Sequence, residues 1–384
     1  MQITIIAGAR PNFIKIAPII KEIERLILKG EGLKYRLVHT GQHYDQKMSD
    51  TFFRELNIPA PDANLGCGGG TQAEQTGAIM IAFEKELIAN PTDLVMVVGD
   101  VTSTMACSIV AKKLNTKVAH VEAGIRSFDL SMPEEINRIV TDALADYFFT
   151  TTELANENLR KAGVPKEKIF FVGNIMIDTL LANKYRFQKP KLWDEIGLQK
   201  GEYFVITLHR PANVDGETHF KALLETIIES SRGLPIIFPV HPRTAKIIEA
   251  IYRPVSPSLP FSQSLPHSLT KSPLLPSSLH LIDPLGYLEF NYLVENAKAV
   301  ITDSGGITEE TTVMGVPCIT LRDNTERPET ITIGTNELIG TNPSAVKPAF
   351  DKLFAGKWKK GGIPELWDGK TAIRITSILI DIDT

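Results

Sequence analysis

Short apolar runs recur along this chain, and each one ends in a polar turn that leads into a helical pattern. Ile3–Ala7 is followed by a helix expected near Asn12–Lys29, and Leu94–Val98 by one near Ser103–Leu114. The same pattern predicts strands at Arg36–Thr40, Lys117–Val121, Tyr147–Thr150, Tyr203–Leu208, Ile236–Val240, Leu279–Ile282, Ala299–Thr302 and Cys318–Leu321. Because parallel strands need long crossovers, which helices supply, the alternation predicts parallel sheets covered by helices.

The length predicts two domains. A chain of 384 residues exceeds one ordinary core, and a second series of strand-like runs begins after Pro190. We expect one α/β domain over residues 1–185 and another over residues 186–365. The remaining segment, residues 366–384, contains an apolar stretch, Thr371–Asp381, that is expected to form a packed helix.

Composition narrows the class of protein. The net charge of -4 argues against a non-specific nucleic-acid binder, and no apolar run reaches transmembrane length. The apolar start of the chain is too short for a signal peptide and has no basic residues before it. We therefore expect a cytoplasmic protein with no nucleic-acid or membrane partner. Cys67, Cys107 and Cys318 have no metal-ligand spacing and are expected to be free thiols.

One segment interrupts the pattern. Pro254–Ser278 is rich in serine and proline, which excludes a regular helix or a central strand. We expect an exposed loop inserted before the strand at Leu279, with a partner-binding segment as the alternative.

Polar clusters follow seven of the expected strands and come from both halves of the chain. They read GARPNFIK, GQH, GD, HVEAG, LHRPAN, HPR and DSGG. In open α/β sheets, ligands bind outside the carboxyl ends of the strands. The clusters therefore predict one ligand site in a cleft between the two domains.

The first cluster has the features of an anion site. Gly8 permits a tight turn and Pro11 suits the first turn of a helix. Arg10 and Lys15 would then face a diphosphate together with the helix amides. The alternative is a solvated helix start with ordinary charges.

Carboxylates gather in the middle of the first half. Asp100 and Glu122 each end a strand, and Glu134 and Glu135 follow Pro133 at a helix start. Carboxylates that converge on one site can divide general acid and base roles, because burial and repulsion separate their pKa values. Glu135 alone is interpreted as a helix-start residue that compensates the dipole.

Two histidines with nearby arginines end strands of the second half. His209-Arg210 and His241-Pro242-Arg243 favour a polyanion pocket over a metal site, because their spacing matches no zinc signature. No metal is therefore expected.

The stretch DSGGITEE is expected to join a strand to a helix. Ser304, Gly305 and Gly306 would let backbone amides approach a phosphate, and Arg327 follows the next strand. Glu309 and Glu310 are expected in the first turn of that helix.

Ten motifs together resemble one family, the non-hydrolysing UDP-N-acetylglucosamine 2-epimerases. They are GARPNFIK, TGQHYD, VGDVTST, HVEAGIRS, PEEINR, HRPANVD, HPRT, DPLGY, DSGGITEET and RDNTERPET, and they extend from Ile3 to about Gly340. The resemblance implies an α/β fold of GT-B type, with two Rossmann-like domains whose parallel sheets face a central cleft. It also implies a last helix returning to the first domain, a homodimer, and no cofactor.

The activity that the resemblance implies is the interconversion of UDP-GlcNAc and UDP-ManNAc. UDP would leave C1 as a base removes the C2 proton, and it would add back to 2-acetamidoglucal. By resemblance, Asp100, Glu122 and Glu134 are the acid and base candidates, and His209 assists near the diphosphate. The residues expected to bind the substrate are Arg10, Lys15, Gln42, His43, Arg138, His241, Ser304, Gly305, Gly306, Glu310 and Arg327. Among them, Glu310 would bind the ribose, and Glu309 would be a helix-start residue.

Three other functions stay open. A GT-B glycosyltransferase would use a similar UDP site but would have less reason for three carboxylates. A hydrolysing epimerase would release free ManNAc, and a nucleotide-sugar sensor would need no acid or base.

This chain also has Asn12 and the sequence His209-Arg210-Pro211-Ala212 where many members have Glu and HRRE-like sequence. Relatives that act on UDP-diacetamido sugars or uronates share the motifs, so the exact sugar is open too.

Overall fold

The computed structural model describes residues 1–42, 53–240, 242–252 and 276–383. These residues divide into two compact units, Met1–Tyr185 with Pro364–Thr384 (unit 1) and Arg186–Ile363 (unit 2). Within the described parts of the chain, no helix is both long and apolar enough to cross a membrane. Most of the Ser/Pro-rich segment predicted as a loop lies outside them.

Unit 1 contains a seven-stranded parallel sheet in the order β3-β2-β1-β4-β5-β6-β7. The strands are β1 (Gln2–Ala7), β2 (Lys34–His39), β3 (Ala63–Asn64), β4 (Leu94–Val98), β5 (Lys117–Val121), β6 (Tyr147–Thr150) and β7 (Ile169–Phe171). The helices are α1 (Arg10–Leu28), α3 (Gln72–Ala89), α4 (Thr102–Lys113), α5 (Pro133–Leu144), α6 (Glu153–Lys161), α7 (Ile175–Asn183) and α16 (Thr371–Asp383). Short 3-10 turns occur at Lys166–Lys168 and Lys184–Arg186.

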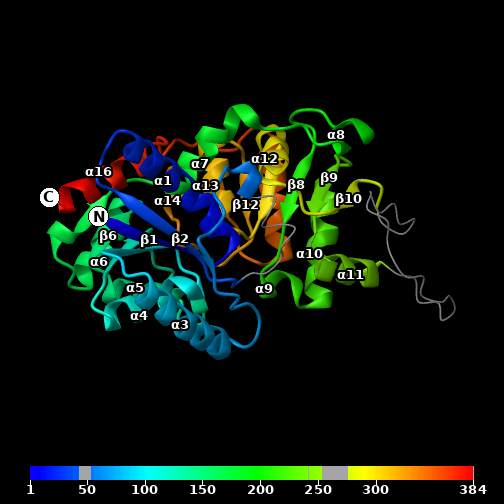
Figure 1. The fold of residues 1–384 in the computed structure, drawn as a ribbon. Coiled ribbons are helices and arrows are strands. Elements are labelled where there is room, and N and C mark those ends of the chain that lie inside the picture. The colour runs from blue at the N-terminus through cyan, green and yellow to red at the C-terminus, as the bar shows by residue number, and fades with distance from the viewer. Residues whose placement is uncertain (43–52, 241, 253–275, 384) are drawn as a thin grey trace. The chain divides into compact units, whose positions relative to one another are not determined.

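Helices cover both faces of this sheet, as its continuous apolar strands require. Helices α1, α7 and α16 pack together on one face, and α3, α4 and α5 pack on the other (Figure 1). All five residues of β4 are buried. Helix α16 is held at its start by Asp178 on α7, whose carboxylate accepts the backbone N–H groups of Thr371 (3.0 Å) and Ala372 (2.7 Å). The end of the chain therefore belongs to unit 1.

Unit 2 contains a six-stranded parallel sheet in the order β10-β9-β8-β11-β12-β13. The strands are β8 (Phe204–Thr207), β9 (Ile236–Pro239), β10 (Leu279–Ile282), β11 (Ala299–Thr302), β12 (Cys318–Thr320) and β13 (Asn336–Leu338). The helices are α8 (Leu192–Glu195), α9 (Pro211–Val214), α10 (Glu217–Ser230), α11 (Pro242–Ile251), α12 (Tyr287–Asn296), α13 (Gly305–Met314), α14 (Glu329–Thr332) and α15 (Val346–Phe354), with a 3-10 turn at Pro343–Ala345.

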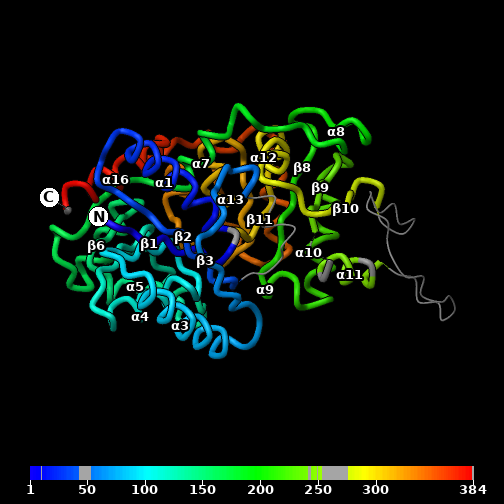
Figure 2. The backbone as a smooth tube through the Cα atoms, in the orientation of Figure 1, coloured from blue at the N-terminus to red at the C-terminus, as the bar shows by residue number. Residues whose placement is uncertain are grey.

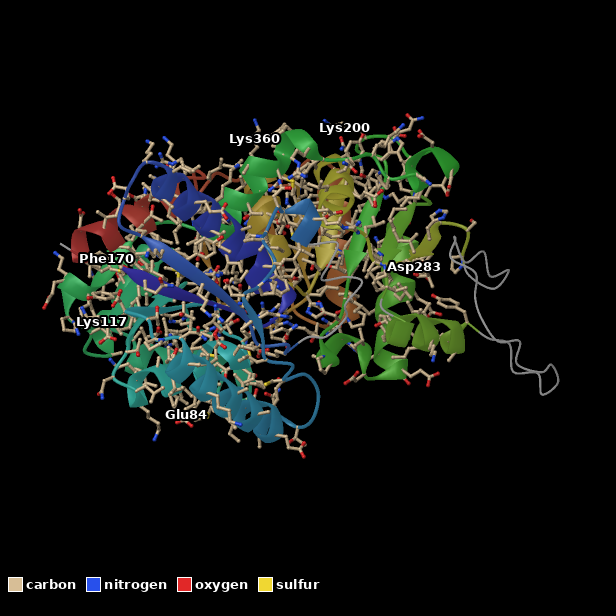
Figure 3. All side chains as sticks on the ribbon, viewed as in Figure 1. Glu84, Lys117, Phe170, Lys200, Asp283 and Lys360 are labelled. Atoms are coloured by element: carbon tan, nitrogen blue, oxygen red, sulfur yellow. The ribbon has the colours of Figure 1, made fainter. Side chains whose placement is uncertain are left out.

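The sheet of unit 2 separates two apolar cores. Phe204 on β8 packs on one face with Phe220 of α10 and Phe350 of α15. Its neighbours Tyr203 and Val205 pack on the other face, in the core to which α12 contributes. Figure 2 follows the chain through the two units, and charged side chains such as Glu84 and Lys200 point outward from them (Figure 3).

The prediction of an α/β fold of GT-B type with two Rossmann-like parallel-sheet domains is confirmed. Strands β4, β5, β6, β10 and β11 have the bounds expected from their apolar runs. The short strands β3, β7 and β13 were not predicted, because two or three residues are too few to show a pattern. Each sheet has one point where the strand order reverses direction, between β1 and β4 in unit 1 and between β8 and β11 in unit 2. Ligands of open α/β sheets bind at such points.

Candidate functional site

The loops after β1 and β4 meet closely at the reversal point of unit 1. A Cβ atom on Gly8 would lie 2.1 Å from the Ser103 hydroxyl oxygen, so only glycine fits there. The Asn12 side chain accepts the backbone N–H groups of Gly8 (3.1 Å) and Ala9 (2.9 Å) and donates to the carbonyl of Val98 (2.8 Å). Asn12 therefore ties the start of α1 to the end of β4.

Lys15 and Glu122 form a buried ion pair at this point. The Lys15 Nζ lies 2.5 Å from Glu122 Oε2, and the two side chains are 10% and 3% exposed. Glu122 has a φ of 72°, which is uncommon for a residue other than glycine and is a form of strain that occurs at functional sites. Lys15 was predicted to face a diphosphate. Here its charge offsets that of a carboxylate that would be costly to bury alone.

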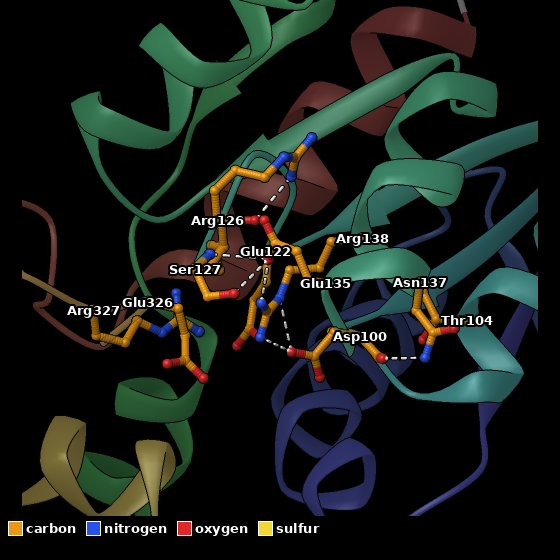
Figure 4. A network of polar contacts seen from close by, with 12 residues as sticks. Asp100, Thr104, Glu122, Arg126, Ser127, Glu135, Asn137, Arg138, Glu326 and Arg327 are labelled. Atoms are coloured by element: carbon orange, nitrogen blue, oxygen red, sulfur yellow. Dashed lines mark hydrogen bonds and ion pairs between the residues drawn. The ribbon is translucent and has the colours of Figure 1, made fainter. Parts of the chain in front are cut away.

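Arg138 joins two of the carboxylates that the sequence singled out (Figure 4). Its Nη2 lies 2.6 Å from Asp100 Oδ2 and its Nη1 lies 2.7 Å from Glu135 Oε2. Glu135 also accepts the backbone N–H groups of Ser127 (2.9 Å) and Phe128 (3.1 Å). Burial raises the pKa of Glu135, but these hydrogen bonds and Arg138 outweigh it, so the pKa is lowered.

Glu135 lies in the first turn of α5, where a helix-start residue is expected. Its carboxylate is in addition buried and holds the turn at Ser127-Phe128, which the sequence did not indicate. Glu134 beside it is exposed.

Gln42, the last residue described before a gap, accepts the backbone N–H (3.1 Å) and hydroxyl (2.7 Å) of Ser103 with its side-chain oxygen.

A buried histidine, His120, connects the loops of this site. His120 Nδ1 is 2.7 Å from Asp142 Oδ1, and His120 Nε2 is 2.8 Å from the carbonyl of Gly99. Asp142 also pairs with Arg126 Nη1 (2.6 Å) and accepts the N–H of Gly124 (3.1 Å). Burial raises the pKa of Asp142, but His120 and Arg126 together outweigh it and lower that pKa. This network connects the loops that carry Asp100 and Glu122.

Asp303 is the corresponding centre in unit 2. Its fully buried carboxylate lies 2.8 Å from His209 Nδ1 and accepts the backbone N–H of Arg210 (2.9 Å) and the side-chain N–H of Asn213 (3.0 Å). Burial raises the pKa of Asp303, but His209 and the other donors outweigh it and lower that pKa. The His209 side chain is 64% exposed.

Helix α13 begins two residues after Asp303. Its N-cap residue, Ser304, makes no side-chain capping bond, and Gly305 and Gly306 form the first turn. Arg322 is buried and paired with Glu326, and its Nε has no hydrogen-bond partner in the described chain. A Cβ atom on Gly305 would lie 4.0 Å from Arg322 Nη1 and 3.8 Å from Glu326 Oε1. The first turn of α13 therefore combines backbone amides with a nearby guanidinium that is itself paired, and amides at a helix start are suited to an anion.

The two adjacent glutamates of α13 have different partners. Both lie in its second turn and are buried, so the expectation that they open the helix is wrong. Glu309 forms an ion pair with buried Arg327, which makes it a packing partner of that arginine. Glu310 instead accepts a hydrogen bond from the Tyr287 hydroxyl (2.8 Å). Burial raises the pKa of Glu310 to about 7, although Tyr287 lowers it in part.

Some predicted site residues lie outside the described structure. They are His43, His241 and the side chain of Arg10. Sequence reasoning in turn missed Asp142, Asp303 and Arg322. The signal for Asp303 was present, because it directly follows one expected strand while His209 follows another. Across the described residues, no group of three or more His, Cys, Asp or Glu side chains is placed to hold a metal ion.

Two parallel-sheet units with polar groups at the reversal point of each sheet define a protein of the GT-B class. Residues 27–380 match the family model described as UDP-N-acetylglucosamine 2-epimerase. The chain is 40% identical over 387 residues to the UDP-N-acetylglucosamine 2-epimerase of Methanocaldococcus jannaschii, which covers 99% of each chain. It is 38% identical over 344 residues, and 88% of each chain, to the UDP-2,3-diacetamido-2,3-dideoxy-D-glucuronate 2-epimerase of Pseudomonas aeruginosa.

A comparison with solved structures points to the same family. The crystal structure of the M. jannaschii UDP-GlcNAc 2-epimerase in complex with UDP-GlcNAc and UDP matches with a TM-score of 0.84 and 39% identity over 99% of each chain. The chain belongs to the UDP-N-acetylglucosamine 2-epimerase family, so the resemblance inferred from its motifs is confirmed.

Proposed function

We propose that this protein interconverts UDP-GlcNAc and UDP-ManNAc without hydrolysing them. UDP would leave C1 as the C2 proton is removed, and it would add back to 2-acetamidoglucal after a proton reaches the opposite face of C2. The observation that carries the proposal is the 40% identity, over 99% of both chains, to an enzyme named UDP-N-acetylglucosamine 2-epimerase. The carboxylates Asp100, Glu122 and Glu134 of unit 1, of which Glu122 is buried, support it, because two faces of C2 need two proton-handling groups.

Unit 1 would supply the proton chemistry. Glu122 is buried and paired with Lys15 at the end of β5, and we assign it the role of a base. Asp100 is held by Arg138, and Glu134 is exposed in the first turn of α5, the helix that carries Arg138. In this proposal Gln42 and His43 contact the sugar. Lys15 and Arg138 act indirectly, by holding the carboxylates of Glu122 and Asp100 in place.

Unit 2 would hold UDP. The amides at Ser304, Gly305 and Gly306 would bind the diphosphate, and His209 would lie near it. Glu310 would accept hydrogen bonds from the ribose hydroxyls. Arg10, His241 and Arg327 are the proposed further cations for the nucleotide. Arg327 is paired with Glu309 in this structure, so its contribution would include holding α13 in place.

The test uses UDP-GlcNAc in deuterated water, with no acceptor, and follows C2 by NMR. The proposal expects UDP-ManNAc with deuterium at C2. It also expects Glu122→Gln to reduce turnover by about 100-fold or more, with UDP affinity nearly unchanged. Glu153→Gln, in an exposed ion pair on α6, is the matched control. Free ManNAc would contradict the proposal and favour hydrolysis, and binding without exchange would favour sensing. No exchange in this assay, together with sugar transfer in a second incubation to which an acceptor is added, would favour glycosyl transfer.

A second substrate is favoured by one observation. The 38% identity to the P. aeruginosa 2-epimerase of a diacetamido uronate makes UDP-2,3-diacetamido sugars the alternative substrates. The same exchange assay, run with both sugars in parallel, decides between them by the ratio of kcat/KM.

We also propose a homodimer in the cytoplasm that supplies precursors for a surface polysaccharide. Light scattering would then give twice the chain mass of 42.4 kDa.

A further inference from the structure

Asp303 and His209 leave the sheet of unit 2 from neighbouring strands. Thr207 of β8 and Thr302 of β11 are paired in register, and their hydroxyl oxygens lie 2.6 Å apart. Asp303 follows directly, and its backbone N–H donates to the carbonyl of Thr207 (3.2 Å). His209 is two residues beyond Thr207, so the register of the two strands brings its ring to the Asp303 carboxylate.

The hydrogen bonds on Asp303 determine how the ring is oriented. The carboxylate accepts the backbone N–H groups of His209 (3.1 Å) and Arg210 (2.9 Å) and the amide of Asn213 (3.0 Å). These donors favour the ionised form, and an ionised carboxylate is only an acceptor. His209 Nδ1, 2.8 Å from Asp303 Oδ1, must therefore donate. The other ring nitrogen, Nε2, is left to face solvent or a ligand.

Burial within the pair is strongly uneven. Asp303 is 0% exposed while the His209 side chain is 64% exposed. Within the described chain, no hydrogen bond to His209 Nε2 is found, and the first turn of α13 begins two residues after Asp303. The carboxylate thus fixes one side of a ring whose other side is open. The chain leads from the same carboxylate into α13, whose first-turn amides are suited to an anion.

We propose that Asp303 is a positioning residue that holds His209 in the Nδ1–H tautomer and so presents Nε2 to the ligand. In the neutral ring Nε2 is an acceptor, and in the charged ring Nε2–H donates a hydrogen bond to an anionic oxygen. The identity of that oxygen, on the departing diphosphate of a UDP-sugar, rests on the proposed function. The tautomer itself does not.

The first measurement is the ring ¹⁵N spectrum of His209 in the full-length, ligand-free protein at alkaline pH, assigned with His209→Gln. We expect the Nδ1–H tautomer to predominate. In Asp303→Asn, the new amide can turn an N–H toward Nδ1, so the ring should change to the Nε2–H tautomer. Asn213→Ala removes another donor to the same carboxylate and should leave the tautomer unchanged. A wild-type ring that is mainly Nε2–H overturns the proposal even if Asp303→Asn does not fold.

The second measurement is turnover with UDP-GlcNAc. Asp303→Asn should lower kcat by about 100-fold or more and change KM by less than about threefold, because the ring stays in place with the wrong nitrogen protonated. Asn213→Ala should lower kcat by less than about tenfold. If Asp303→Asn keeps the wild-type tautomer, or changes it and keeps more than a tenth of kcat, the proposal is wrong. If the wild type shows the expected tautomer but does not epimerise the sugar, the proposed function fails and the positioning role stands.

Discussion

Each unit contains a histidine bonded through Nδ1 to a buried aspartate, and the two pairs differ in what the second ring nitrogen meets. In unit 1, His120 Nδ1 lies 2.7 Å from Asp142, and Nε2 lies 2.8 Å from the Gly99 carbonyl. In unit 2, His209 Nδ1 lies 2.8 Å from Asp303 and the ring is 64% exposed. The first histidine uses both nitrogens to connect two loops, whereas the second keeps one available. The same His–Asp pair therefore links two loops in unit 1, through His120, and holds an exposed ring in unit 2, that of His209.

The buried carboxylates differ in the same way. In unit 1, Glu122, Glu135 and Asp142 each meet a lysine or arginine. In unit 2, Glu310 accepts a hydrogen bond from the Tyr287 hydroxyl, and its pKa is raised to about 7, mainly by burial. Charged partners help to lower the pKa of Glu135 and Asp142 despite burial, whereas burial raises the pKa of Glu310.

The largest expected effect is on stability, at Asp142. Asp142→Asn would take the counter-charge from Arg126, whose side chain is only 10% exposed, and would disturb the buried hydrogen bond to His120. Breaking a buried ion pair by removing one partner typically costs about 3–5 kcal/mol. Urea unfolding measures the loss. Glu153→Gln, in the exposed ion pair with Arg160, should cost less than about 1 kcal/mol. Equal losses for the two variants would show that the His120 network contributes no more than a surface pair.

The next effect separates the two histidines by activity. His209→Gln should lower kcat by about 100-fold or more and change the free energy of unfolding by less than about 1 kcal/mol, because the ring is exposed. His120→Gln should instead lower stability, because two buried hydrogen bonds are disturbed. Activity assays and urea unfolding on both variants give the contrast. A strongly destabilised His209→Gln protein would mean that His209 is a structural residue like His120.

A smaller effect concerns pH and Glu310. Uridine contains the ribose but no phosphate, so its binding isolates this contact. With the pKa of Glu310 at about 7, the ionised fraction rises from about one-tenth at pH 6 to about nine-tenths at pH 8. Ribose hydroxyls donate to a carboxylate, so uridine affinity should rise about tenfold over that range. Calorimetry measures the profile, and Glu310→Gln should make it flat. A flat profile in the wild type would exclude Glu310 as the ribose acceptor.

The sequence predicted the fold more fully than the site. Alternating apolar runs and polar turns located β4, β5, β10 and β11 to the residue, since a buried parallel strand is a continuous apolar run. The partners of polar side chains depend on contacts distant in sequence, such as Lys15 with Glu122 or His209 with Asp303. The pattern PEE predicted a helix start but did not distinguish exposed Glu134 from buried Glu135. Burial of single side chains is a property of the packed structure.

The smallest effect tests what distinguishes Glu310 from the paired carboxylates of unit 1. The Tyr287 hydroxyl donates to Glu310 at 2.8 Å and lowers its pKa in part, opposing burial. Tyr287→Phe removes this donor and keeps the ring, so the midpoint of the uridine profile should move to higher pH by less than about one unit. The affinity at pH 9, where Glu310 is ionised in both proteins, should change by less than about threefold. A midpoint that moves to lower pH would mean that the hydroxyl favours the protonated carboxyl, and that burial alone accounts for the difference between the two units.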